Sequence, residues 1–224
     1  NQREAVKEER RLRVDNQPYT RSIFEAAYTQ LDAKRCFPYS HSIIGSMADL
    51  DAARTANVQA FFDLYYAPNN ATLVVAGDFR PAEARALITQ YFGDIPRSRT
   101  TPAAITCDQP FSTGAVRRRV QDTNANLPAV MQIFRIPAYD SPDYPALELL
   151  GAILGQGESS RLNRTLVRQS RLAAAAPVLV NPFGPRSGPG EFLVLAIANQ
   201  GASVDSLDAA IATQLARIAA DGVD

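Results

Sequence analysis

The chain has 224 residues, of which 46% are hydrophobic and 21% are charged. This composition is typical of a globular protein, and the length allows one or two domains. Basic and acidic residues both number 23, so the chain lacks the positive charge that nucleic-acid binding requires. No apolar run approaches the length of a membrane span, and no signal peptide is present. We expect neither a nucleic-acid partner nor a membrane span in this piece.

The first twelve residues predict a helix with one carboxylate in an unusual place. At 100° per residue, Ala5, Val6 and Leu12 form a narrow apolar stripe, and Glu9 falls inside it. The other side of the helix carries most of the charges, at Arg3, Glu4, Lys7, Glu8 and Arg11. A carboxylate on a buried face needs an ion-pair partner, a hydrogen bond or a metal ion. We therefore expect Glu9 to face inward beside either a nearby arginine or a metal.

Helices and one strand follow in the first half of the chain. Apolar residues at helical spacing predict helices over residues 21–33, 55–66 and 82–92. Between the last two, the apolar and β-branched run 71–76 predicts a strand that is buried on both faces. Residues 97–111 have prolines and threonines without periodicity, which predicts a linker.

The second half predicts paired strands with helices between them. We expect strands at residues 117–122, 129–136, 178–180 and 192–198, and helices at 142–154, 160–169 and 203–218. Strands grouped in pairs favour an α+β layered sandwich, in which an antiparallel-rich sheet has helices on one face.

The candidate metal and redox residues are few. His41 is the one histidine, and the chain contains no H-x-x-E-H motif. A catalytic zinc needs three protein ligands, so we expect His41 to be a loop residue without a metal role. Cys36 and Cys107 lie far apart in unlike loops. They are expected to be free thiols, with a disulfide as the alternative in an oxidising compartment.

Several segments resemble one family. They are the run from Arg3 through Glu9 to Tyr19, then Phe37 to Leu50, then Phe61 to Asp78, and Gly155 to Leu162. Together they resemble the insulinase/pitrilysin-type zinc metallopeptidases, the inverzincins, in their bacterial forms akin to mitochondrial processing peptidase. In that family an H-x-x-E-H helix supplies two zinc ligands and a catalytic glutamate.

The resemblance assigns roles and boundaries. Glu9 matches the third zinc ligand, and Gln2 matches a supporting position behind it, where many members have Glu. Residues 1–96 would be the C-terminal half of the zinc-binding repeat, 97–111 the linker, and 112–224 a second, non-catalytic repeat that is truncated at its C-terminus. The implied fold is that of the LuxS and processing-peptidase metallopeptidases. As a fragment without the histidines and the general-base glutamate, the chain should neither hydrolyse peptides nor bind zinc tightly.

The resemblance also implies partners. Many non-catalytic repeats carry an Arg and a Tyr that help hold the substrate. Here the matching positions are Val167 and Ala174, although Arg168 would restore a basic group if the alignment shifted by one residue. The intact protein is thus expected to bind peptides or unfolded polypeptides and to form a heterodimer with a zinc-free subunit that supplies the pair. The bacterial periplasm is the favoured location, with the cytoplasm as the alternative.

Two rival functions remain. The first is a non-catalytic structural or chaperone-like subunit of the same family, against which the retention of Glu9 argues. The second is a stand-alone binding module, against which the length of the resemblance argues. An H-x-x-E-H motif encoded upstream would reject the first alternative.

Overall fold

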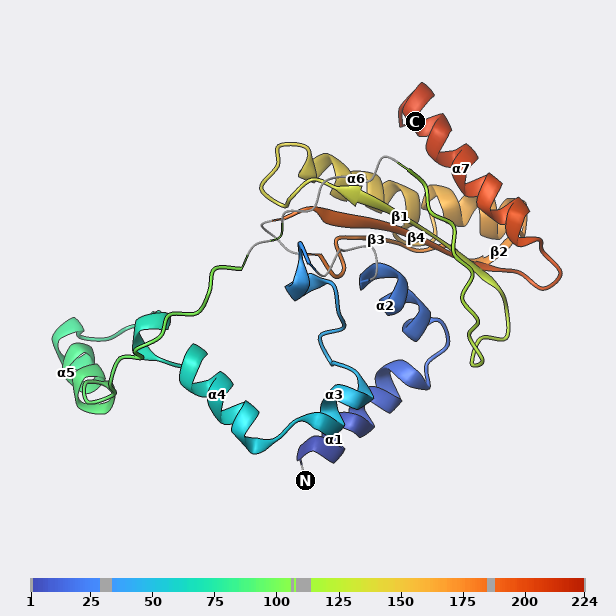
Figure 1. Cartoon of the computed structure of the whole chain (residues 1–224). Coiled ribbons are helices and arrows are strands. Elements are labelled where there is room, and N and C mark those ends of the chain that lie inside the picture. Colours follow the sequence, from blue (N-terminus) through green and yellow to red (C-terminus); the bar gives the residue numbers. More distant parts are fainter. Residues whose placement is uncertain (1, 29–33, 106, 108–113, 185–187, 224) are drawn as a thin grey trace. The chain divides into compact units, whose positions relative to one another are not determined.

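The structure, a computed structural model, describes residues 2–28, 34–105, 107, 114–184 and 188–223 (Figure 1). The chain divides into two compact units. The major unit comprises Asn1–Gly45 and Thr106–Asp224, and the minor unit comprises Ser46–Ile105. Each is described by itself.

A four-stranded antiparallel sheet organises the major unit. It consists of β1 (Ala129–Ile136), β2 (Ala173–Ala175), β3 (Val178–Val180) and β4 (Gly190–Ala198). β4 is the central strand, because it pairs with β1 along its whole length and with β2 and β3 on its other edge. The predicted strands at 129–136, 178–180 and 192–198 are confirmed. The predicted strand at 117–122 is wrong, since no strand is formed there.

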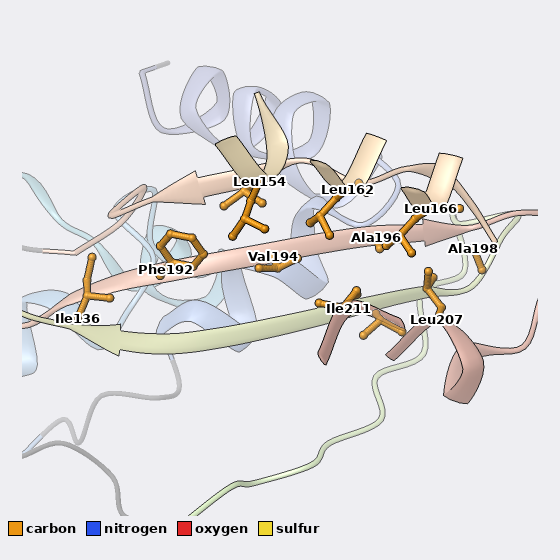
Figure 2. Close-up of a cluster of buried hydrophobic side chains, with 14 of the residues drawn as sticks. Ile136, Leu154, Leu162, Leu166, Phe192, Val194, Ala196, Ala198, Leu207 and Ile211 are labelled. Carbon is orange, nitrogen blue, oxygen red and sulfur yellow. The ribbon is translucent and has the colours of Figure 1, made fainter. Parts of the chain in front are cut away.

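Helices cover one face of this sheet and complete the main hydrophobic core (Figures 1 and 2). They are α6 (Tyr144–Gly155), the π-helical η4 (Asn163–Gln169) and α7 (Val204–Asp221). Alternate residues of β4 point into the core, where they meet buried leucines and an isoleucine from the helices; the main members are Phe192, Val194, Ala196, Leu154, Leu162, Leu207 and Ile211. The predicted α+β sandwich with an antiparallel sheet is therefore confirmed.

Two glycines let α6 lie close to β3. A Cβ atom on Gly151 would come within 2.5 Å of Val180, and one on Gly155 would come within 2.4 Å of the Val178 backbone. Contacts under 3.0 Å do not occur between real side chains, so any larger residue would push the helix off the sheet.

The opposite face of the sheet is covered in part by α2 (Thr20–Tyr28), as Figure 1 shows. On α2, Phe24 and Tyr28 make ring contacts with Phe183 at centroid distances of 5.0 and 5.8 Å. The predicted helix over 21–33 is confirmed as far as Tyr28, and residues 29–33 lie outside the described residues.

Two charged residues with buried polar atoms, Glu191 and the half-buried Arg135, lie on this second face. Glu191 of β4 is 2% exposed and pairs in register with Arg135 of β1. Burial raises the pKa of Glu191 to about 7, although the positive charge of Arg135 opposes the shift. Burial likewise lowers the pKa of Arg135. Oε2 of Glu191 and all three guanidinium nitrogens of Arg135 are buried without a hydrogen-bond partner among the described residues, which is a costly arrangement.

The N-terminal segment is α1 (Gln2–Arg10) followed directly by the π-helical η1 (Arg11–Asp15). It is tied to the loop before β1. The Tyr19 backbone N–H donates to Asp122 Oδ2 at 2.8 Å, and the Tyr19 hydroxyl donates to the Leu127 carbonyl at 2.9 Å. Desolvation raises the pKa of Asp122, but backbone N–H donors and the Ser22 hydroxyl outweigh it and hold that pKa below its usual value.

A disulfide joins Cys36 to Cys107, so the expectation of free thiols is wrong. Cys36 is fully buried and directly precedes the 3₁₀ helix η2 (Phe37–Tyr39). The two cysteines are separated by 71 positions, and the chain between them contains the whole minor unit. Sequence spacing did not reveal the pair because the fold, rather than the chain, brings the two loops together.

The minor unit contains α3 (Met47–Ala52), α4 (Thr55–Tyr65), the 3₁₀ helix η3 (Pro68–Asn70) and α5 (Pro81–Phe92). Ser46 and Asp49 form a capping box at the start of α3. The predicted helices at 55–66 and 82–92 are confirmed. The predicted strand at 71–76 is wrong for the described chain, because these residues pair with no described strand and are all exposed.

The disulfide should stabilise the major unit. By loop-closure entropy, a loop of this size contributes about 4 kcal/mol to the free energy of unfolding. Replacing both Cys36 and Cys107 by Ala should lower the melting temperature of the signal that reports the sheet. Reduced wild-type protein is the matched control and should have the same melting temperature as the double variant. A double variant with the melting temperature of the oxidised wild-type protein would contradict the assignment.

The stability of the major unit should fall as pH rises from 4.5 to 7, because folded Glu191 holds its proton up to about pH 7 whereas the unfolded carboxyl releases it near 4.5. The loss is roughly 3 kcal/mol. Glu191→Gln should remove this component from denaturant-derived unfolding free energies measured across the window. The exposed Glu148→Gln serves as control and should keep the wild-type slope. A Glu191→Gln protein with an unchanged slope would refute the raised pKa.

Candidate functional site

Glu9 lies on α1 and is not buried. Its side chain is 49% exposed, and its Oε1 atom forms an ion pair with Arg13 Nε at 3.2 Å. The expectation that Glu9 faces inward is therefore wrong for this chain. Of the two expected partners, an arginine or a metal ion, the arginine is present as Arg13.

The face of α1 that is covered is a different one. Lys7 and Arg10 have side chains that are only 14% and 15% exposed, and Val14 in η1 is 4% exposed. Arg10 donates to the Gly45 carbonyl and to Asp15 Oδ1, the latter at 3.2 Å. These residues recur at helical spacing, and the 100° rule puts Glu9 on roughly the opposite side.

The uncovered face keeps the predicted pattern. Ala5, Leu12 and Gln2 are exposed on the same side of the helix as Glu9, and Leu12 is 57% exposed. The helix then changes to a π-helical turn, closed by the hydrogen bond from the Asn16 N–H to the Arg11 carbonyl at 2.8 Å. Such turns are frequent at functional sites. The roles of Glu9 as ligand and Gln2 as its support stay predictions.

The described residues do not fit a zinc site by themselves. No group of three His, Cys, Asp or Glu side chains is placed to hold a metal in the described part of the chain. His41 is exposed, its ring centroid lies 4.8 Å from that of Phe37 with the two rings tilted by 55°, and its Nδ1 atom lies 3.3 Å from the Ser42 carbonyl oxygen. Glu9 thus supplies one carboxylate where three ligands are required.

The segment that matches the family's substrate-holding pair has no such groups. Val167 in η4 is partly buried against the core, and Ala174 is exposed on β2. Arg168 is ion-paired with Glu158 at the surface. Neither position presents the Arg or the Tyr that the resemblance would require.

Sequence reasoning missed the buried pair of Arg135 and Glu191. The predicted strand began at Phe192 and so left Glu191 outside the sheet. The sequence does place opposite charges near the ends of the two strands. Only the register of β1 against β4, however, shows that Arg135 and Glu191 face each other.

The comparisons with known proteins agree with this architecture. A family model described as the peptidase M16 inactive domain matches residues 54–224. The chain therefore belongs to the M16 peptidase family, and the resemblance to the insulinase-type zinc metallopeptidases is confirmed.

Individual relatives give further matches, of which the structural one covers nearly the whole chain. The chain is 32% identical over 181 residues to zinc protease PqqE of Helicobacter pylori, which covers 78% of this chain and 39% of that protein. The crystal structure of a protease from Helicobacter pylori matches with a TM-score of 0.82 and 26% identity over 99% of this chain and 52% of that chain.

A third match concerns the fold alone. The peptidase M16 inactive domain from Pseudomonas fluorescens has a TM-score of 0.73 at 20% identity, over 99% of this chain and 51% of that chain. The chain thus spans about half the length, or less, of the relatives it matches. No helix among the described residues is long and apolar enough to cross a membrane.

Proposed function

We propose that this chain is part of a zinc-dependent endopeptidase that hydrolyses peptides or unfolded polypeptides. It would contribute the non-catalytic repeat and one metal ligand, and would be inactive alone. The observation that carries the proposal is Glu9 on an uncovered helix face beside exposed Ala5 and Leu12. A carboxylate within an exposed apolar stripe suits a helix face that a further helix covers.

The two histidines and the general-base glutamate would then come from chain that precedes these residues in a longer protein. The length of a relative supports a longer protein, since 61% of zinc protease PqqE of Helicobacter pylori lies outside the match, as the 39% coverage implies. The boundaries of the repeats at 1–96, 97–111 and 112–224 belong to the same proposal. Residues 106 and 108–111 of the linker lie outside the described residues.

A zinc-free partner subunit is part of the proposal. Val167 and Ala174 leave the family's Arg and Tyr positions without polar groups, so those groups would have to be supplied in trans. The bacterial periplasm is the proposed location. The disulfide between Cys36 and Cys107 supports an oxidising compartment of this kind over the cytoplasm.

One observation favours the rival structural or chaperone-like subunit. The ion pair between Arg13 and Glu9 gives that carboxylate a partner without any metal. The two functions differ in whether the longer protein binds zinc through Glu9.

Glu9→Gln in the longer protein should lower zinc affinity, because a neutral amide is a poorer ligand than a carboxylate. We expect a loss of roughly 10- to 100-fold or more, which is the effect of removing even an outer-sphere partner, together with most of the peptidase activity. Zinc content by mass spectrometry and peptide hydrolysis give the two readings.

Glu8→Gln is the matched control for that experiment. Glu8 is the neighbouring carboxylate, is 57% exposed, and is ion-paired with Arg11 at 3.0 Å. It should leave zinc content and hydrolysis at wild-type levels. Unchanged zinc in Glu9→Gln would remove Glu9 from the ligand set and favour the structural subunit.

The longer protein should cleave peptides only slowly without its partner, since Val167 and Ala174 supply no group that holds a substrate. Adding the zinc-free subunit should raise the rate, and Ala174→Tyr, at an exposed position, should raise the rate of the lone subunit. Full activity of the purified protein alone would contradict the proposal that it needs a zinc-free partner subunit.

A further inference from the structure

The helix that carries Glu9 is attached to the major unit at its C-terminal end. No residue of α1 is buried, whereas Val14 of η1 is 4% exposed, and Arg10, the last residue of α1, donates to the Gly45 carbonyl. Residues 16–19 then lead from η1 into α2. The direction of α1, and hence the place of Glu9, therefore depends on how this turn is held.

The turn contains a residue in an unfavourable backbone conformation. Tyr19 has a φ of 65°, which lies in the left-handed region that residues other than glycine and asparagine rarely adopt. A strained conformation of this kind persists only where the surrounding structure stabilises it. The contacts of Tyr19 and its neighbours thus show what fixes the turn.

Residues 122–127 supply those contacts, although they lie 100 or more positions further along the chain. Oδ2 of Asp122 accepts hydrogen bonds from the Tyr19 backbone N–H at 2.8 Å and from the Ser22 hydroxyl at 3.3 Å. The Tyr19 hydroxyl donates to the Leu127 carbonyl at 2.9 Å. The end of the turn that leads into α2 is therefore bonded to this loop.

Asn124 bonds the other end of the turn. Its side-chain amide donates to the carbonyl of Asp15, the last residue of η1, at 2.7 Å. Its backbone N–H donates to Oδ1 of Asp122 at 2.9 Å, which closes the loop on itself as an Asx turn. The loop leads directly into β1, which pairs with β4 along its whole length. The turn is thus anchored to the sheet of the major unit.

We propose that Asp122 and Asn124 are positioning residues for the helix that carries Glu9, because they fix the turn between η1 and α2 and so set the direction of α1 relative to the sheet. In the proposed organisation, Glu9 belongs to the zinc-binding repeat and residues 122–127 to the non-catalytic repeat. The non-catalytic repeat would then orient a residue of the peptidase site without touching the substrate. This role rests on the proposed function only in assigning Glu9 to that site.

Hydrogen exchange on the 224-residue chain tests whether the loop fixes the turn. Asp122→Asn leaves one accepting oxygen in place of two, so the side chain cannot bond both the Tyr19 and the Asn124 N–H groups. The Asn16 and Tyr19 amides should exchange roughly 10-fold faster or more, because a hydrogen bond to a charged acceptor is lost. Asn124→Ala should speed exchange at Asn16, and the amides of β4 should keep their rates in both variants. Wild-type rates at Asn16 and Tyr19 would overturn the proposal.

Pulsed EPR between two spin labels measures the direction of α1 itself. Glu4→Cys on α1 and Ala212→Cys on α7 are exposed positions for the labels, and the native cysteines are joined to each other. The distance distribution should be narrow in the otherwise wild-type chain and broader in Asp122→Asn. Asp205→Asn, which changes an 86% exposed carboxylate on α7, is the matched control and should keep it narrow. A narrow distribution in Asp122→Asn, or an equally broad one without it, would overturn the proposal.

Kinetics of the longer protein test the consequence for the site. Asp122→Asn should lower kcat roughly 10- to 100-fold, since a displacement of about 1 Å can have an effect of this size. The KM should stay unchanged, because Asp122 holds a turn rather than the substrate, and Asp205→Asn should alter neither constant. Wild-type kcat in Asp122→Asn, with hydrolysis lost in Glu9→Gln, would overturn the positioning role alone. Unchanged hydrolysis in Glu9→Gln would instead overturn the proposed function, while the exchange and EPR results would still decide what sets the direction of α1.

Discussion

The burial of β4 on both faces is the constraint on which the major unit depends. Its even-numbered residues from Phe192 to Ala198 form the floor of the helix-covered core, while Leu193 and Glu191 are buried on the side of α2. Every other strand of the described sheet pairs with it. Because β4 is held from both faces, the sheet can keep two buried charges, Arg135 and Glu191, at one end despite their desolvation cost.

The minor unit has a similar apolar patterning, but its apolar residues are not buried as those of β4 are. Its apolar periodicity forms α4 and α5, and its apolar run at 71–76 is as suited to burial as β4 is. Yet every residue of that run is exposed. An apolar pattern states which side chains must leave water but not which segment removes them. The two units therefore differ in what covers them rather than in how their sequences are patterned.

Local and non-local information account for what the sequence could predict. Helices were predicted because their periodicity lies within the segment, and the three strands of 129–136, 178–180 and 192–198 were flanked by turns. The disulfide of Cys36 and Cys107, and the facing of Arg135 and Glu191, depend on register and fold, which no window of sequence contains. The helical wheel correctly grouped Glu9 with Ala5 and Leu12. The wheel could not show which face of α1 the described chain covers.

The chain is a member of the M16 peptidase family in which the major unit has a buried core and the minor unit, with one buried residue, has almost none. Limited proteolysis of the 224-residue chain tests this claim most directly. The first cuts should fall within residues 46–105, and under denaturing conditions the two fragments should stay joined until the Cys36–Cys107 bond is reduced. First cuts within residues 129–221, with residues 46–105 resistant, would contradict the account.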